Sequence, residues 1–179
     1  MWHHHNYEAA AEMRKKYIPI EKVMSLVDLS QSDVIMDIGG GDGYYSTLFG
    51  EKCGKVYYVD PSNPAVNLVR KRLSGNTGNI EIMQEDICTM KLPEDITKVF
   101  FSNSFHDIGC RENLIDRLSG ASKNQIKFIL IEFKKDSSIG PPEYVKIDQD
   151  ELDSIFGRHG YRLEKREVLQ EHYISSYIR

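Results

Sequence analysis

Short apolar runs alternate along the chain with segments whose apolar residues recur every three or four positions. The second spacing is that of a helix with one buried face, and the short runs are typical of buried strands. Helices are predicted over residues 7–17, 20–27, 44–53, 63–73, 111–119 and 148–160. Strands are predicted over residues 34–38, 55–60, 79–86, 98–103, 126–133, 161–169 and 172–179.

The connections between these runs predict how the strands pair. The segment IKFILIEF, residues 126–133, is a continuous apolar strand of the kind found in the middle of a parallel sheet. The last two runs are joined by Gln170 and Glu171 alone, and so short a connection requires an antiparallel hairpin. The other strands are linked through helices, and such crossovers are right-handed. The sequence therefore predicts a doubly wound α/β sandwich with a seven-stranded, mostly parallel sheet and one antiparallel strand at the C-terminus.

The composition fits one compact domain over residues 1–179. Of these residues 40% are hydrophobic and 28% are charged, and the net charge is −4. No run approaches the ~18 apolar residues of a membrane span, and the mild acidity argues against nonspecific binding to nucleic acid. The three cysteines match no zinc spacing, so reduced thiols in a cytoplasmic protein are expected. No metal site is predicted, and the histidines at 3–5 are native or belong to a tag.

The segment DIGGGDGYYS, residues 37–46, places four glycines between the first strand and the next helix. A simple turn needs less conformational freedom, and ligands of open α/β sheets bind at the carboxyl ends of the strands. The dinucleotide fingerprint G-x-G-x-x-G fits from neither Gly39 nor Gly41, because its last position falls on a tyrosine or a serine. Asp37 would repel a pyrophosphate and would suit a cation, such as the α-amino group of S-adenosylmethionine.

The extended segment VIMDIGGGDGYYS, residues 34–46, resembles the first motif of class I S-adenosylmethionine-dependent methyltransferases, and three further motifs follow in order. The resemblance is to the methyltransferase type 11 group, which includes quinone C-methyltransferases and many small-molecule enzymes. It implies a Rossmann-like sheet of order 3-2-1-4-5-7-6 with strand seven antiparallel. It also implies in-line methyl transfer from S-adenosylmethionine to a small-molecule acceptor, with S-adenosylhomocysteine as the product.

The first two motifs imply contacts with the methionine tail and the ribose. In the first motif the implied cofactor-binding residues are Asp37, Gly39, Gly41 and Gly43. The second motif is VYYVDPS, in which Asp60 and Pro61 follow the second strand. Asp60 would accept hydrogen bonds from both ribose hydroxyls, and the alternative is a solvated turn aspartate.

The third and fourth motifs imply contacts with the adenine and with the methionine end. In MQEDI, Asp86 would accept a hydrogen bond from the adenine amino group and Ile87 would lie near the ring. The alternative for Asp86 is a helix or turn cap. In FFSNSFHDI, the backbone of Ser102 and Asn103 would contact the methionine end of the cofactor.

Phe105, His106 and Asp107 follow the fourth motif and are the candidates beside the methyl group. His106 is a candidate base for a hydroxyl, an enol or a protonated amine, and its alternative role is to pack or cap the next loop. Asp107 either orients His106 or caps the helix over residues 111–119. Orientation alone can supply ~7–11 kcal/mol and a base adds ~10²–10⁴-fold, so an enzyme here does not require an obvious triad.

Two segments are candidates for contact with the acceptor. After the fifth strand, polar groups are offered to a substrate by Glu132, Lys134, Lys135, Tyr144 and Lys146, although a solvated loop explains them as well. Residues 6–29 are predicted to form a helical lid. In the lid, Tyr7 and Tyr17 would close over the cofactor, or Tyr17 would be part of the core. Phe105 is also a candidate substrate contact, with packing as the alternative.

Two other functions stay open at the level of the sequence. One is a non-catalytic S-adenosylmethionine-binding protein, and the other is an NAD-dependent oxidoreductase. Nucleic-acid amino methyltransferases of this fold carry an Asn/Asp-Pro-Pro-aromatic stretch after strand four, where this chain has Asn103-Ser104-Phe105-His106. No nucleic-acid partner is therefore predicted, and a monomer or homodimer is expected.

Overall fold

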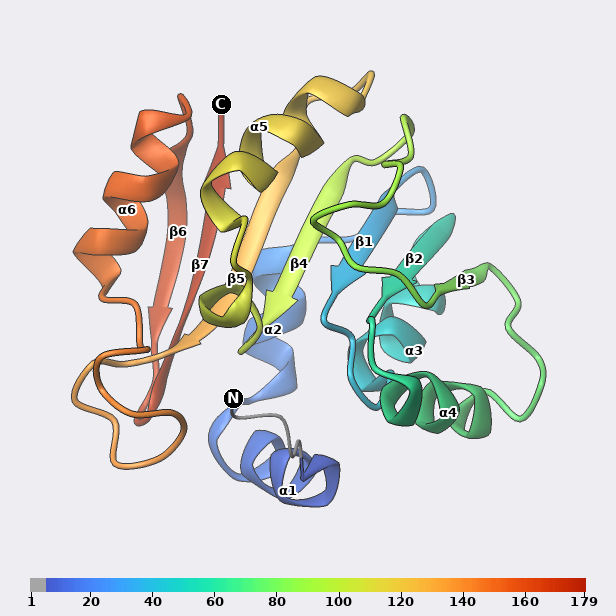
Figure 1. Ribbon diagram of the computed structural model, residues 1–179, viewed down its shortest axis with the longest axis horizontal. Helices are drawn as coiled ribbons and strands as arrows, with labels where there is room; N and C mark the ends of the chain where they lie inside the picture. Colours follow the sequence, from blue (N-terminus) through green and yellow to red (C-terminus); the bar gives the residue numbers. More distant parts are fainter. Residues whose placement is uncertain (1–5) are drawn as a thin grey trace.

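The computed structural model describes residues 6–179 and contains one seven-stranded sheet within them (Figure 1). The strands cross the sheet in the order β3-β2-β1-β4-β5-β7-β6. β7 is antiparallel to β5 and to β6, and the remaining pairs are parallel. The predicted fold class and strand order are confirmed. The strands are β1 Val34–Ile38, β2 Lys55–Val59, β3 Ile80–Met83, β4 Lys98–Ser102, β5 Lys127–Phe133, β6 Arg162–Val168 and β7 His172–Ile178.

Helices cover both faces of the sheet. They are α1 Tyr7–Tyr17, α2 Ile20–Val27, α3 Tyr44–Gly50, α4 Asn63–Arg72, the short 3-10 helix η1 Phe105–Asp107, α5 Arg111–Ala121 and α6 Gln149–Arg158. α2, α3 and α4 join one buried cluster, which includes Phe100 of β4. α5 and α6 join the other, which includes Phe101, because successive strand residues point to opposite faces. Within residues 6–179, no helix has the length and apolar character to cross a bilayer.

The two N-terminal helices differ in how they pack. α2 buries Val23, Leu26 and Val27 in the core, since its apolar residues share one face. α1 has no buried residue of its own, and Figure 1 shows it beyond the arrowheads of β1 and β4. A lid over residues 6–29 stays a prediction, and α1 is the part of it that contributes no buried residue.

Two predicted element ends are wrong by three residues. The helix after the glycine segment ends at Gly50 instead of residue 53, because the chain turns there to enter β2 at Lys55. β3 ends at Met83 instead of residue 86. Asp86 has already begun a turn, in which its carboxylate accepts a hydrogen bond from the Cys88 N–H (2.9 Å).

The prediction of reduced thiols is wrong for two of the three cysteines. Cys88, in the turn after β3, and Cys110, directly before α5, form a disulfide with their Cα atoms 5.8 Å apart. They are 22 residues apart in the chain, and the packing of the two segments against each other brings them together. Spacing alone gives no sign of that packing. Cys53 is free and buried.

Candidate active site

The glycine segment forms the connection from β1 to α3 at the carboxyl end of the sheet. Gly39 has φ +72°, and a Cβ atom there would lie 2.6 Å from Cβ of Ser104. Gly43 caps α3 with φ +74°, and a Cβ atom there would lie 2.3 Å from a methyl carbon of Val69. Because a side chain at either position would combine a disfavoured backbone conformation with a clash, only glycine fits.

Asp60, directly after β2, binds this loop. One oxygen of its carboxylate accepts from the Gly41 N–H (3.0 Å), and the other accepts from the Ser62 N–H (2.9 Å). The hydroxyl of Tyr58 donates to the carbonyl of Gly41 (2.7 Å) from the same strand. Asp60 is buried, so its carboxylate is held at the glycine loop and is not the solvated turn residue of the alternative interpretation.

α1 is attached over the same loop by polar contacts. The hydroxyl of Tyr7 lies 3.1 Å from Oγ of Ser62, and its ring is 3.7 Å from the place of a Cβ atom on Gly41. Asp42 in the loop accepts from Arg14 of α1 (2.9 Å) and from Arg72 of α4 (2.6 Å). Tyr7 therefore lies at the predicted cofactor site.

Tyr17 is placed differently from Tyr7. Its partly buried ring packs against the core cluster on the α2 side of the sheet, and the ammonium group of Lys16 lies 4.8 Å from the ring centroid. This is the core position that the sequence left open as the alternative for Tyr17.

Asp37 lies beneath the loop. Its side chain is buried and accepts a hydrogen bond from Oγ of Ser46 in α3 (2.6 Å). Burial, together with the nearby charges of Asp60 and Asp42, raises the pKa of Asp37 to about 7, although the Ser46 hydrogen bond acts in the opposite direction. A carboxyl group in this state gains from a nearby cation, and its contact with the cofactor stays a prediction.

At the end of β4, Asn103 adopts φ +52° and contacts a second strand. Its amide nitrogen lies 3.3 Å from Nε2 of His172 at the start of β7. Burial lowers the pKa of His172 to about 4, so this ring is neutral at pH 7. The amide oxygen of Asn103 is buried and has no hydrogen-bond partner among the described residues. Ser102 is the last residue of β4 and pairs with Ile131 of β5.

Asp86 and Ile87 form the turn after β3, where the sequence placed the adenine contacts. Asp86 is exposed and caps the turn through the Cys88 N–H. Ile87 is buried in the core cluster on the α5 side. Arg117 of α5 donates to the carbonyls of Ile87 (2.9 Å) and Cys88 (2.7 Å), and these hydrogen bonds hold the turn against α5. The structure thus shows the capping role of Asp86, and its adenine role stays a prediction.

His106 in η1 pairs with Glu132 near the end of β5. Nδ1 of His106 lies 2.6 Å from Oε2 of Glu132, and both side chains are almost fully buried. Burial lowers the pKa of His106, but the hydrogen bond and charge of Glu132 outweigh it, and the pKa is raised overall. The sequence predicted a role for each residue but not their contact. The signal that could have indicated the contact was the single carboxylate, Glu132, in a central strand of mostly apolar residues.

Asp107 has neither of its predicted roles in full. It does not cap α5, whose N-cap residue is Cys110. Its carboxylate lies 3.6 Å from Nε2 of His106, and the side chain is 54% exposed. The residue that fixes the His106 ring is Glu132, at the other ring nitrogen.

The three remaining substrate candidates are not brought together. Phe105 is 0% exposed and packs against Phe101 and Phe156, so the substrate contact predicted for it is wrong and the packing role is found. Lys134 donates to the carbonyl of Gln170 (3.3 Å), away from His106. Tyr144 is 79% exposed.

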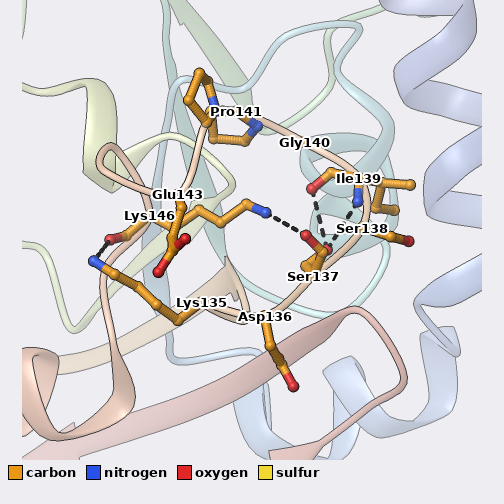
Figure 2. A pocket seen from close by; sticks show the side chains of 10 residues that line it. Lys135, Asp136, Ser137, Ser138, Ile139, Gly140, Pro141, Glu143 and Lys146 are labelled. Carbon is orange, nitrogen blue, oxygen red and sulfur yellow. Dashed lines mark hydrogen bonds between the residues drawn. The ribbon is translucent and has the colours of Figure 1, made fainter.

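The loop between β5 and α6 encloses a pocket of about 460 Å³, lined by residues 135–143 and Lys146 (Figure 2). Its lysines bond within the loop: Lys135 donates to the carbonyl of Lys146 (2.7 Å), and Lys146 donates to that of Ser137 (2.6 Å). The pocket is therefore lined by this loop alone. The loop packs through Gly140 on Phe133, whose ring also contacts His106.

Comparison with known families shows to which family this fold and its motifs belong. The model of a family described as a methyltransferase domain matches residues 35–124, half of the chain. The chain belongs to this family. The matched part begins at β1 and ends after α5, so it contains the glycine loop, Asp60, Asp86 and His106. The predicted membership of a methyltransferase family is confirmed, and S-adenosylmethionine stays the predicted cofactor.

Curated relatives of this methyltransferase match only part of it. A probable ribosomal RNA small subunit methyltransferase A from Methanococcoides burtonii is 32% identical over 75 residues, 42% of this chain and 27% of that protein. An rRNA adenine N-6-methyltransferase from Lysinibacillus sphaericus is 25% identical over 114 residues, 64% of this chain and 46% of that protein. The chain thus spans less than half the length of either relative.

Solved structures match the methyltransferase over most of its length. A SAM-dependent methyltransferase from Aquifex aeolicus superposes with a TM-score of 0.82 at 22% identity, covering 93% of this chain and 92% of the other. Magnesium protoporphyrin IX methyltransferase from Synechocystis PCC 6803, with bound S-adenosylhomocysteine, gives 0.70 at 13% identity, covering 89% and 81%. Both show the same fold.

The residues of the site suit this cofactor. At Gly41 the place of a Cβ atom has only ordinary contacts, the nearest of them with the Tyr7 ring (3.7 Å), and Asp60 places a carboxylate beside the loop. The unpartnered amide oxygen of Asn103 is an acceptor for an ammonium group. The cofactor's methionine tail carries such a group, and its ribose carries two hydroxyl donors.

Proposed function

We propose that this methyltransferase transfers the methyl group of S-adenosylmethionine to a small-molecule acceptor and releases S-adenosylhomocysteine. The observation that carries the proposal is the contact between Asp60 and the Gly41 N–H, at 3.0 Å, within the matched methyltransferase region. It supports a ribose site beside the loop that receives the amino-acid tail. The sulfonium supplies a methyl group that is already activated.

The cofactor would be held from three sides. Asp60 accepts hydrogen bonds from the ribose hydroxyls, each worth ~1.5–3 kcal/mol when the acceptor is charged. Asp86 and Ile87 face the adenine. Asp37 and Asn103 bind the methionine tail, the first through its charge and the second through its unpartnered oxygen.

His106 would then act as the base for the acceptor. Orientation of the acceptor against the methyl group contributes ~7–11 kcal/mol, and a base adds ~10²–10⁴-fold. His106 is suited to this because the hydrogen bond and charge of Glu132 raise its pKa, which makes the ring a stronger base.

Two observations favour a small molecule over a nucleic acid as the acceptor. The net charge of −4 gives the protein no overall attraction to phosphates. Phe105 and His106 stand where nucleic-acid amino methyltransferases have the second proline and the aromatic residue of their motif. Because the two side chains are 0% and 9% exposed, neither ring offers a face on which a base can stack.

A nucleic-acid acceptor is the second candidate, because the curated relatives are named as ribosomal RNA methyltransferases. The aligned parts cover 42% and 64% of this chain. Asn103 matches the first position of the nucleic-acid motif, and the next three residues differ. A non-catalytic cofactor-binding protein is a third candidate. The lid, the cytoplasmic location and the monomeric or homodimeric state stay predictions.

One experiment separates these candidates. The protein is incubated with a cofactor analogue that carries a transferable label, once with a metabolite extract and once with total RNA, and the products are analysed by mass spectrometry. We expect label on a small molecule, and less of it at the same cofactor concentration when Asp60→Ala replaces the wild type. Label on RNA alone would overturn the small-molecule acceptor, and no label with intact cofactor binding would favour a non-catalytic protein.

A further inference from the structure

The carboxylate of Glu132 makes three contacts with the turn that carries His106. Oε1 accepts from the N–H groups of Phe105 (3.1 Å) and His106 (3.4 Å), and Oε2 lies 2.6 Å from Nδ1 of His106. Glu132 is 0% exposed. A buried carboxylate is costly unless donors surround it, so the contacts explain how an acid is tolerated in a central, apolar strand.

These contacts fix both the orientation and the protonation of the His106 ring. A carboxylate only accepts hydrogen bonds, so Nδ1 carries the proton and Nε2 is the basic nitrogen. The ring of Phe133 meets the imidazole edge-on, with centroids 6.2 Å apart. Glu132 and Phe133 are neighbours on β5, so one strand holds the ring through both contacts.

We propose that Glu132 is a positioning residue that keeps Nε2 of His106 basic, and that the acceptor is a phenolic or enolic hydroxyl compound. This inference rests on the methyl transfer proposed above. The acceptor atom forms its bond to the methyl carbon while the carbon–sulfur bond breaks and leaves its electron pair on sulfur. The hydroxyl proton of the acceptor moves to Nε2. An imidazole is matched to such moderately acidic hydroxyls.

Three charged groups surround His106, each on a different element. Glu132 of β5 faces Nδ1, Asp107 of η1 lies 3.6 Å from Nε2, and Arg111 of α5 donates to the His106 carbonyl (3.4 Å). Burial and Arg111 lower the pKa of His106, and the two acids raise it, with Glu132 the stronger. Loss of the Glu132 charge therefore lowers the pKa.

The variant Glu132→Gln tests the positioning role without a measurement of enzyme activity. Its amide oxygen can still accept from the backbone N–H groups, but its NH₂ group donates to Nδ1, which moves the ring proton to Nε2. Nitrogen NMR of histidine-labelled protein is recorded across a pH titration, with and without S-adenosylhomocysteine. We expect a protonated Nδ1 in the wild type, and a protonated Nε2 with a lower pKa in Glu132→Gln. Glu112→Gln, on the exposed side of α5, is the matched control.

An Nδ1 without a proton in the wild type, or equal pKa values in wild type and variant, would overturn the positioning role. The wild-type spectrum gives this result even if the variant does not fold. This outcome can be distinguished from failure of the proposed function. If the protein did not bind S-adenosylhomocysteine, the methyltransferase function would be contradicted, but the NMR spectra would still show which nitrogen of His106 carries the proton.

Turnover tests the acceptor class. With a panel of phenols, enols and thioethers and labelled cofactor, we expect methylation of phenols or enols. Glu132→Gln should lower kcat by ~10²-fold or more with unchanged S-adenosylhomocysteine affinity. Where the wild-type rate rises with pH through the raised pKa of His106, this limb should move to lower pH in the variant. Methylation of the thioethers alone, or an unchanged pH profile, would contradict the acceptor class.

Discussion

The cofactor side and the acceptor side of the site are built from different kinds of contact. The cofactor side comprises the glycine loop, Asp60 and the Asp86 turn. Its central contact joins Gly41 to Asp60, 19 residues apart. The acceptor side comprises residues 105–107, Glu132 and His172, and it meets the cofactor side at Asn103. Its contacts join residues 26 apart, His106 and Glu132, and 69 apart, Asn103 and His172.

This difference explains why one side is visible in the sequence and the other is not. Consecutive βα units carry the parts of the cofactor side, so short motifs that follow one another along the chain contain them. The acceptor side depends on how β4, β5 and β7 lie next to one another. One covalent bond links the two sides, because Cys88 follows the Asp86 turn and Cys110 follows η1.

The largest effect is expected on the acceptor side. Replacing His106 with alanine removes the proposed base, so turnover should fall by ~10²–10⁴-fold. The cofactor side does not depend on this ring, so S-adenosylhomocysteine affinity measured by calorimetry should hardly change. Full activity in His106→Ala would dismiss the residue as the base, and a parallel loss of affinity would show that the two sides are not separable in this way.

The link between the two sides should matter next, for stability. Reduction of the Cys88–Cys110 disulfide removes a cross-link that closes a loop of about 20 residues, which predicts a loss of ~3 kcal/mol in the free energy of unfolding. Urea denaturation with and without a dithiol reductant measures it. In Cys88→Ser the reductant should have no further effect. Equal midpoints for oxidised and reduced wild type would contradict the prediction.

On the cofactor side, Asp60→Ala should weaken S-adenosylhomocysteine binding at least tenfold, about 1.4 kcal/mol. The variant removes the ribose acceptor and the partner of the Gly41 and Ser62 N–H groups. Glu94→Ala is a suitable control, because that residue forms an exposed ion pair with Lys123. An unchanged affinity in Asp60→Ala would refute the ribose role.

Much of the fold and the cofactor side could be predicted from the sequence. The apolar runs predicted the number of strands, because each is short and bounded by polar or glycine residues. The spacing of Asp37, Gly39, Gly41 and Gly43 indicated the ligand, and the structure shows why glycine is required at the first and last of these glycine positions. Element ends were less accurate where a predicted strand was extended into the turn that follows it, as at Asp86.

The acceptor side could be predicted only in part. His106 was found from its place after β4, but its partner lies on another strand. Phe105 was assigned a substrate contact from sequence proximity alone, although 3-10 geometry turns its ring into the core. The disulfide was missed for the same reason, since cysteine spacing does not show which segments pack together.

The central claim is that the glycine loop binds S-adenosylmethionine and not a dinucleotide. The most direct test is calorimetry on two samples of one protein preparation. One sample is titrated with S-adenosylhomocysteine and the other with NADH. We predict saturable binding of S-adenosylhomocysteine and no binding of NADH. Binding of NADH without binding of S-adenosylhomocysteine would contradict the account.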